Sequence, residues 1–180
     1  MGHAHQLSDI LAWSHFGAHQ TSETPPDEVW VLHGILGSRQ NWARFARLLS
    51  EANPQLSILT IDLRCHGESP EFSGPHTVNA CAQDLQELAR SRGEPSVIIG
   101  HSFGGKVALS YATKHPRNLR TVWTLDSPLD AAPQAGQSEV LRLIETCAQA
   151  PLPLHSRAKL IEWFVEQDFA MGVAQWMTTN

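Results

Sequence analysis

The feature of this sequence that most constrains its fold is a repeated alternation of short apolar runs with longer amphipathic segments. The apolar runs have the length of strands and are bounded by turn-forming residues, while the segments between them carry apolar residues at helical spacing. Strands that alternate with helices form βαβ units with right-handed crossovers. We therefore predict an α/β fold with a mostly parallel sheet and helices on both faces. The predicted strands are 29–33, 57–61, 96–100 and 120–125, and the predicted helices are 41–52, 78–92 and 103–115.

The two ends of the chain differ from this central pattern. Residues 11–16 suggest an earlier, antiparallel edge strand. Residues 127–138 are rich in Pro, Ala, Gly and Ser, which is typical of a linker or domain boundary. Beyond Ser138 the segments 139–150, 156–167 and 168–179 have helical patterns with no strand between them. We therefore expect a sheet domain over residues 1–130 and a helical cap or lid over residues 131–180.

The most specific local motif is Gly100-His101-Ser102-Phe103-Gly104, which has the form G-x-S-x-G. It directly follows a predicted buried strand and opens a predicted helix, which is the context that this nucleophile motif requires. Glycines two residues to either side of Ser102 let the strand and the helix approach closely. The first amides of the helix favour negative charge near the serine. We therefore predict that Ser102 is an exposed nucleophile.

A phosphate-binding loop is the alternative for this segment. Gly100 to Lys106 also satisfies the pattern G-x-x-x-x-G-K. In a phosphate loop the next residue is a Ser or Thr that binds magnesium, but here it is Val107. The run also lacks the loop that precedes the helix in nucleotide sites, so the nucleophile interpretation is favoured.

Two further motifs follow the earlier predicted strands. His33-Gly34-Ile35-Leu36-Gly37 comes directly after the first strand of the alternation. Residues 62–69, DLRCHGES, come after the second. Asp62 and His66 could form a triad with Ser102, but we expect them to belong, with Arg64, to a hydrogen-bonded turn that shapes the floor of a pocket.

The segments HGILG, DLRCHGES and GHSFGGKVAL, in this order and spacing, resemble the α/β-hydrolase fold-1 family over about residues 29–130. The resemblance implies that residues 1–130 hold the first six strands of an incomplete core. It implies that the backbone amides of Ile35 and Phe103 form an oxyanion hole, with His33, Gly34, Gly100, His101 and Gly104 shaping the site. The strand end at 125–128 and the helical tail are similar to the branch of small esterases and acyl thioesterases.

A serine needs a base to take its proton and an acid to orient that base. Asp126, at the end of the predicted strand after the helix, is a candidate acid, although many relatives place the acid after the following strand. The family pattern places the histidine beyond the lid, and the chain stops inside it. After Ser102 only His115 and His155 remain. We expect His115 to be exposed and far from the serine, and we expect the chain to be truncated in the lid.

Composition excludes several other classes. Of the 180 residues, 42% are hydrophobic and 17% charged, as in a globular protein, and the net charge of −5 argues against nucleic acid and anionic membranes as partners. Three cysteines without metal-type spacing and no visible signal peptide predict a cytoplasmic protein. Two hypotheses remain: an esterase or thioesterase acting on a small acyl substrate without metal or cofactor, or a binding protein of the same fold that lacks the base histidine.

Overall fold

The computed structural model describes residues 10–18, 27–127, 139–151, 153 and 156–178. The contacts within the chain divide it into two compact units, Met1–Leu129 and Asp130–Asn180. The first unit contains a sheet and the second contains helices alone among its described residues. Each unit is described by itself.

The first unit is built on one five-stranded sheet with the strand order β1-β3-β2-β4-β5. β1 pairs with β3 in antiparallel fashion, and every other pairing is parallel. The predicted parallel sheet and antiparallel edge strand are therefore confirmed. The strands are β1 (Trp13–Gly17), β2 (Glu28–Leu32), β3 (Ser57–Ile61), β4 (Val97–His101) and β5 (Thr121–Leu125).

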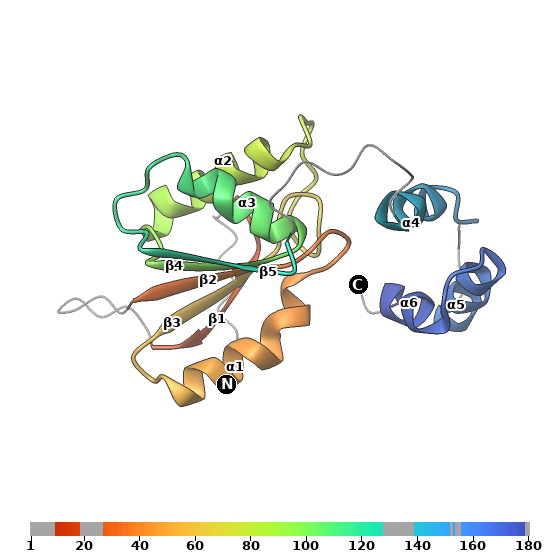
Figure 1. The fold of residues 1–180 in the computed structure, drawn as a ribbon, viewed down its shortest axis with the longest axis horizontal. Helices are drawn as coiled ribbons and strands as arrows, with labels where there is room; N and C mark the ends of the chain where they lie inside the picture. Colours follow the sequence, from red (N-terminus) through yellow and green to blue (C-terminus); the bar gives the residue numbers. More distant parts are fainter. Residues whose placement is uncertain (1–9, 19–26, 128–138, 152, 154–155, 179–180) are drawn as a thin grey trace. The chain divides into compact units, whose positions relative to one another are not determined.

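Helices cover both faces of the sheet, as predicted (Figure 1). On one face lies α1 (Ala43–Ala52), which follows a short 3₁₀ turn at Arg39–Trp42 and packs against β1 and β3. On the other face lie α2 (Val78–Arg92) and α3 (Phe103–Ala112), which also pack against each other. Thr77 caps α2 through its side chain, which accepts from the amide of Ala80, and Gly93 follows its end.

The main core lies between the sheet and the α2–α3 layer. Its side chains come from alternate positions of the strands and from the inner faces of both helices, as the two periodicities require. Leu85 and Leu88 of α2 are fully buried. Other members of this core are Trp30, Leu32, Leu59, Ile61, Ile98, Val107 and Tyr111.

The sequence pattern identified only part of the buried face of α1 and overstated the burial of β4. Trp42, Phe45, Leu48 and Leu49 have helical spacing, but only Trp42 and Leu49 pack against the core beside the buried Ala46, while Phe45 and Leu48 are exposed. In β4, Ile98 and Gly100 are buried but Val97 and Ile99 are half-buried, because α1 lies over β1 and β3 rather than over β4 and β5. Apolar spacing identifies a stripe on a helix but not how much of that stripe the sheet covers.

The six strands expected in residues 1–130 stay a prediction. The described part of residues 1–130 contains five strands. Residues 1–9, 19–26 and 128–130 lie outside the described residues, so a sixth strand is not identified in this sheet.

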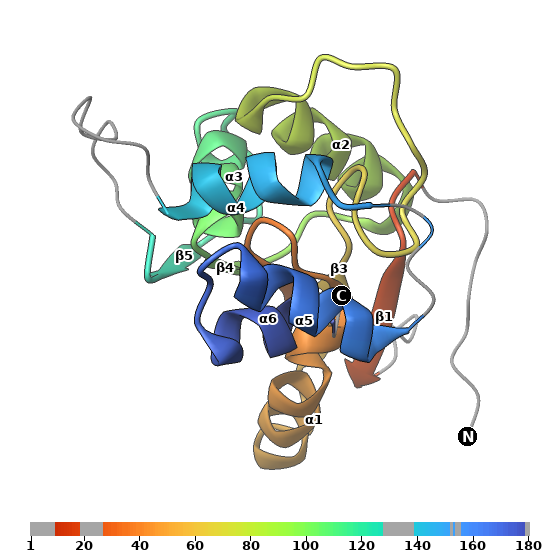
Figure 2. The same ribbon diagram turned by 90° about the vertical axis from the view of Figure 1, so that its right-hand side faces the viewer.

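The second unit contains three helices where the sequence predicted them, α4 (Glu139–Ala148), α5 (Arg157–Glu166) and α6 (Met171–Met177). α5 and α6 lie side by side (Figure 1 and Figure 2). Phe164 and Phe169 are buried between them, with their rings edge to face at a centroid distance of 5.7 Å. These two phenylalanines therefore form the core of the helical unit, whereas Trp176 is 40% exposed.

Candidate active site

Ser102 occupies a sharp turn between β4 and α3. The strand ends at His101 and the helix begins at Phe103, so the serine is the single residue between them. Its backbone is left-handed, with φ 49° and ψ −112°, a conformation that costs a non-glycine residue about 1–3 kcal/mol. The direct passage from strand to helix leaves no room for a phosphate-binding loop. The structure thus gives Ser102 the place between a strand and a helix that the motif requires.

Two glycines make this turn possible. A Cβ atom on Gly100 would lie 2.4 Å from the carbonyl oxygen of Gly104, so the strand and the helix meet at backbone distance. A Cβ atom on Gly104 would lie 2.5 Å from the carbonyl oxygen of His33, at the end of β2. Both atoms belong to backbone that cannot move aside. Glycine is therefore required at both positions for the reason inferred from the sequence.

The loop that follows β2 lies against the serine. We call residues 34–37 the candidate oxyanion loop. A Cβ atom on Gly34 would lie 3.5 Å from Cβ of Ser102 and 2.8 Å from Nδ1 of His101. The loop closes on itself, because the amide of Gly37 donates to the carbonyl of Gly34 at 3.0 Å. The structure therefore brings together the two motifs, some 65 residues apart, that the sequence paired.

The two predicted oxyanion donors are the amides of Ile35 and Phe103. Phe103 is the first residue of α3, whose N-terminal amides have no partner within the helix. In the part of the chain that the structure describes, neither amide donates to another protein group. Two amides without a protein partner are candidates for binding a developing negative charge.

Asp126 follows β5 at the same edge of the sheet. The amide of Ser102 donates to the carbonyl of Leu125 at 2.9 Å, and the hydroxyl of Ser127 donates to the carbonyl of Ser102 at 2.8 Å. Asp126 lies between Leu125 and Ser127, the two residues that make these hydrogen bonds, and it has a left-handed φ of 47°. Its side chain is exposed and has no hydrogen-bond or ion-pair partner within the described residues.

No described histidine is placed as a base for Ser102. His115 is exposed at the far end of α3, as predicted, beside cavities of about 250 and 330 Å³ that lie away from the serine. His101 packs toward Trp42, with 6.0 Å between the ring centroids. His33 and His66 bond to backbone groups. His155, together with His3 and His5, lies outside the described residues.

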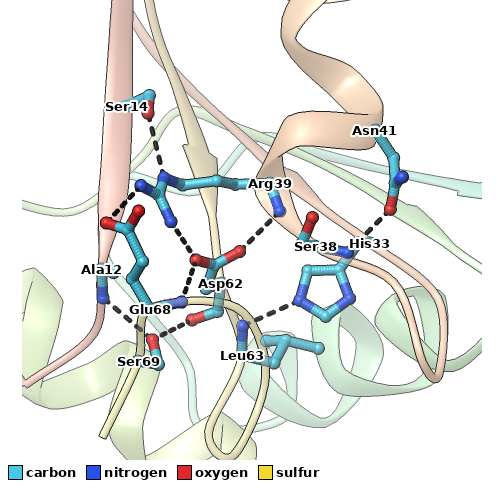
Figure 3. Close-up of polar contacts among 10 residues, drawn as sticks. All are labelled: Ala12, Ser14, His33, Ser38, Arg39, Asn41, Asp62, Leu63, Glu68 and Ser69. Carbon is cyan, nitrogen blue, oxygen red and sulfur yellow. Dashed lines mark hydrogen bonds and ion pairs between the residues drawn. The ribbon is translucent and has the colours of Figure 1, made fainter. Parts of the chain in front are cut away.

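A buried ion pair holds the loops after β2 and β3 together (Figure 3). Asp62 directly follows β3 and is fully buried, and its carboxylate contacts the buried guanidinium of Arg39. The same carboxylate accepts from the amides of Arg39 at 2.6 Å and Glu68 at 2.9 Å. The Arg39 guanidinium also reaches Glu68 at 2.7 Å and the Ser14 hydroxyl at 3.0 Å. Burial opposes the charge of Arg39, but the two carboxylates outweigh it and raise its pKa.

Sequence reasoning missed Arg39. It predicted the turn around Asp62 but gave that carboxylate no cation, because Arg39 lies 23 residues earlier in what looked like an ordinary polar loop. The available signal was an arginine next to a predicted helix start in an otherwise uncharged stretch. An arginine that is 3% exposed must have a charged partner, so the burial identifies the pair once the fold is known.

Arg64 binds to α2 and to the loop before it. It forms two hydrogen bonds of 2.6 Å with the carboxylate of Asp84 on α2, which raise its pKa. It also donates to the carbonyl of Pro75 and stacks on Phe72, 4.5 Å from the ring centre. Asp62, Arg64 and His66 therefore belong to a hydrogen-bonded turn, as expected, and the structure does not form a triad from them.

His33 is buried and neutral. Its Nε2 accepts from the amide of Leu63 at 3.0 Å, and its Nδ1 lies 2.7 Å from the carbonyl of Gly34. Burial lowers its pKa to about 4, and the neighbouring His66 acts in the same direction. Burial likewise raises the pKa of the Cys81 thiol to about 11. Within the described residues, no cluster of three or more His, Cys, Asp or Glu could hold a metal ion, and no helix is long and apolar enough to cross a membrane.

The sequence and the fold both have known relatives. Residues 29–173 match the profile of the alpha/beta hydrolase fold family. The chain is 36% identical over 156 residues to the sn-1-specific diacylglycerol lipase ABHD11 of Mus musculus, covering 83% of this chain and 49% of that protein. It is 35% identical over 102 residues to lipase LipV of Mycobacterium tuberculosis, covering 56% of this chain and 37% of that protein.

Among solved structures, a marine microorganism esterase superposes with a TM-score of 0.74 at 22% identity, over 96% of this chain and 64% of that one. At that identity the likeness concerns the fold alone. The chain spans about half the length of the lipase from Mus musculus, and a smaller share of LipV. From the strand–helix order, the strained Ser102 and the family match over residues 29–173, the chain belongs to the α/β-hydrolase fold family.

Proposed function

We propose that the protein to which this chain belongs is a serine hydrolase that cleaves a carboxylic ester or thioester through an acyl-enzyme, with Ser102 as the nucleophile. The observation that carries the proposal is the position of Ser102. It stands alone between strand and helix in a strained left-handed conformation, with Gly34 of the candidate oxyanion loop against its Cβ. Such strain persists only where the surrounding structure imposes it, and it is typical of functional sites.

The reaction follows from these positions. The Ser102 oxygen attacks the substrate carbonyl carbon while a base takes the hydroxyl proton. The carbonyl oxygen becomes negative and is held by the amides of Ile35 and Phe103. The carbon–oxygen or carbon–sulfur bond then breaks, and the alcohol or thiol leaves with the proton from the base. Water repeats the sequence on the acyl-serine and releases the carboxylic acid.

Asp126 is the proposed acid that orients the base. It lies one residue beyond the strand whose carbonyl binds the Ser102 amide, at the carboxyl edge where the sites of open α/β sheets lie. The base in this proposal is a histidine that the described residues do not place at Ser102.

The names of the relatives support an ester substrate. Two relatives are lipases, one of them specific for the sn-1 position of diacylglycerol, and a fold neighbour is an esterase. We propose a small acyl ester or thioester as the substrate. Neither a nucleic acid nor a membrane is part of this proposal, and the cytoplasmic location stays a prediction from the sequence.

The test is the hydrolysis of p-nitrophenyl butyrate by the 180-residue chain, by the complete translation product of its gene, and by Ser102→Ala in each. The proposal expects the complete product to turn over and Ser102→Ala to lose activity by about 10³-fold or more. Activity in the short chain would place the base within it, and His155→Ala would then be the next variant. If the complete product is inactive with esters and thioesters of several acyl lengths, the binding-protein alternative replaces the enzyme.

A further inference from the structure

We propose that His66 is a positioning residue for the candidate oxyanion loop: it holds the peptide that follows Ile35, so that the Ile35 amide stays aimed at the substrate oxygen. The inference relies on the proposed function only for the role of the Ile35 amide. The loop contacts themselves are independent of that role.

The direction of the Ile35 amide is set by the peptide group that it shares with Gly34. A peptide is planar and trans, so its N–H points opposite to its carbonyl oxygen. The Gly34 oxygen accepts from the Gly37 amide at 3.0 Å and lies 2.7 Å from Nδ1 of His33. These two contacts fix the peptide plane before Ile35.

The plane after Ile35 is held by His66. The amide of Leu36 belongs to the Ile35–Leu36 peptide, and it donates to Nε2 of His66 at 3.3 Å. Leu36 itself is left-handed, with φ 59°, a conformation that is unfavourable for a residue with a side chain and that the Leu36–His66 hydrogen bond helps to hold. Ile35 is therefore held between two fixed peptides, one secured by His33 and the other by His66.

The hydrogen bonds determine which nitrogen of each ring carries the proton. Nε2 of His66 faces an amide and Nδ1 faces the carbonyl of Arg64 at 2.8 Å. His33 has the same arrangement, with Nε2 facing the amide of Leu63. In this arrangement Nε2 of each ring accepts from an amide and Nδ1 carries the proton, because a proton on Nε2 would meet another N–H.

The two histidines connect the loops in opposite directions. His33 leads into the candidate oxyanion loop and accepts from the loop after β3, whereas His66 lies in the loop after β3 and accepts from the oxyanion loop. Their rings are 5.0 Å apart between centroids. The Arg39–Asp62 pair joins the same two loops, but it does so at residue 39, beyond the end of the candidate oxyanion loop. It therefore does not replace the hydrogen bond at Leu36.

The test compares His66→Gln, whose side-chain oxygen can accept from Leu36, with His66→Phe, which keeps a ring but has no acceptor. Removing an oxyanion donor outright costs about 10²–10³ in rate. Because His66 acts through the loop, we expect His66→Phe to lower kcat by about tenfold at unchanged KM, and His66→Gln to recover most of that loss. An unchanged kcat in His66→Phe, or an equal loss in both variants, would overturn the proposal.

A second measurement separates this proposal from the proposed function. Amide hydrogen exchange at Leu36 needs no activity, so it remains decisive even if the protein hydrolyses nothing. We expect exchange at Leu36 to be about tenfold faster in His66→Phe than in the parent or in His66→Gln, with the β3 amides unchanged. Equal exchange at Leu36 in all three proteins would overturn it.

A third measurement on the parent protein covers the case in which His66→Phe does not fold. Nitrogen NMR of the ring should find Nδ1 protonated and Nε2 bare at neutral pH. A proton on Nε2 of His66 would contradict the proposal without any variant.

Discussion

The carboxyl edge of the sheet is held by different means in its two halves. At the ends of β2 and β3, the buried Arg39–Asp62 pair and the two histidines His33 and His66 join the loops that carry the candidate oxyanion donor. At the end of β5, backbone and Ser127 contacts fix the chain, but the side chain of Asp126 is exposed and has no partner within the described residues. The first half is held by buried polar contacts, whereas the Asp126 carboxylate in the second half makes no such contact within the described residues.

This difference predicts which positions affect the free energy of unfolding and which affect the reaction rate. A buried charge must keep its partner or destabilise the fold. An exposed carboxylate can be changed at little cost in stability, so any large effect of its removal must come from the reaction. Variants on the two sides of the edge should therefore separate stability from rate.

The largest expected effect is on rate, at Asp126. If this carboxylate orients the base, Asp126→Asn should lower kcat of the active protein by about 10³–10⁴-fold, as the loss of the orienting acid does in serine hydrolases generally. The urea midpoint should stay within the equivalent of about 0.5 kcal/mol. A kcat near that of the parent would place the acid elsewhere, after a later strand.

The next effect is on stability, at Arg39. Arg39→Met leaves the carboxylate of Asp62 buried without its cation, so we expect a loss of about 3–5 kcal/mol in the free energy of unfolding. Urea denaturation measures it. Arg90→Ala is the matched control, because that arginine forms an exposed pair with Glu87 and should change stability by less than about 0.5 kcal/mol. Similar losses in the two variants would contradict the assigned difference between buried and exposed pairs.

A similar loss is expected at the turn between β4 and α3 that carries Ser102. Gly104→Ala introduces a Cβ atom 2.5 Å from the His33 carbonyl oxygen and 2.8 Å from that of Leu32, so α3 must move away from β2. We expect about 2–4 kcal/mol of destabilisation, measured by urea denaturation. Gly172→Ala, where a Cβ atom meets nothing within 4 Å, is the control and should not destabilise the helical unit. A stable Gly104→Ala protein would show that the strand and helix are less closely packed than described.

The smallest effect concerns pH and His33. Its folded-state pKa of about 4 lies below the ordinary 6.5, so the unfolded chain binds the proton first as the pH falls. The stability that the protein has with His33 neutral is fully present above pH 6.5 and is lost as the pH falls from 6.5 to 4. The lost stability amounts to about 3 kcal/mol at most.

His33→Gln keeps an acceptor for Leu63 but does not titrate, which makes it the control for that effect. Urea denaturation at neutral and at acidic pH should show a smaller loss of stability in His33→Gln than in the parent. Equal losses in both proteins would mean that His33 is protonated in the folded state well above pH 4.

Much of the first half of the site could be predicted from the sequence. Motifs that follow predicted strands must meet at one edge of a parallel sheet, which is why Gly34 and Ser102 could be paired before the structure was known. Arg39 could not be paired with Asp62 in this way, because that contact depends on how a loop folds back over 23 residues. The exposure of Phe45 and Leu48 was missed for a similar reason, since it depends on where α1 lies across the sheet.

The most direct test of Ser102 as the nucleophile is to trap the acyl-enzyme. The complete translation product is mixed with p-nitrophenyl butyrate, quenched in acid and digested, and the peptides are analysed by mass spectrometry. We expect one butyryl group on the peptide that contains Ser102, and none on that peptide in Ser102→Ala. Turnover with the butyryl group on another residue, or turnover that survives Ser102→Ala, would contradict it.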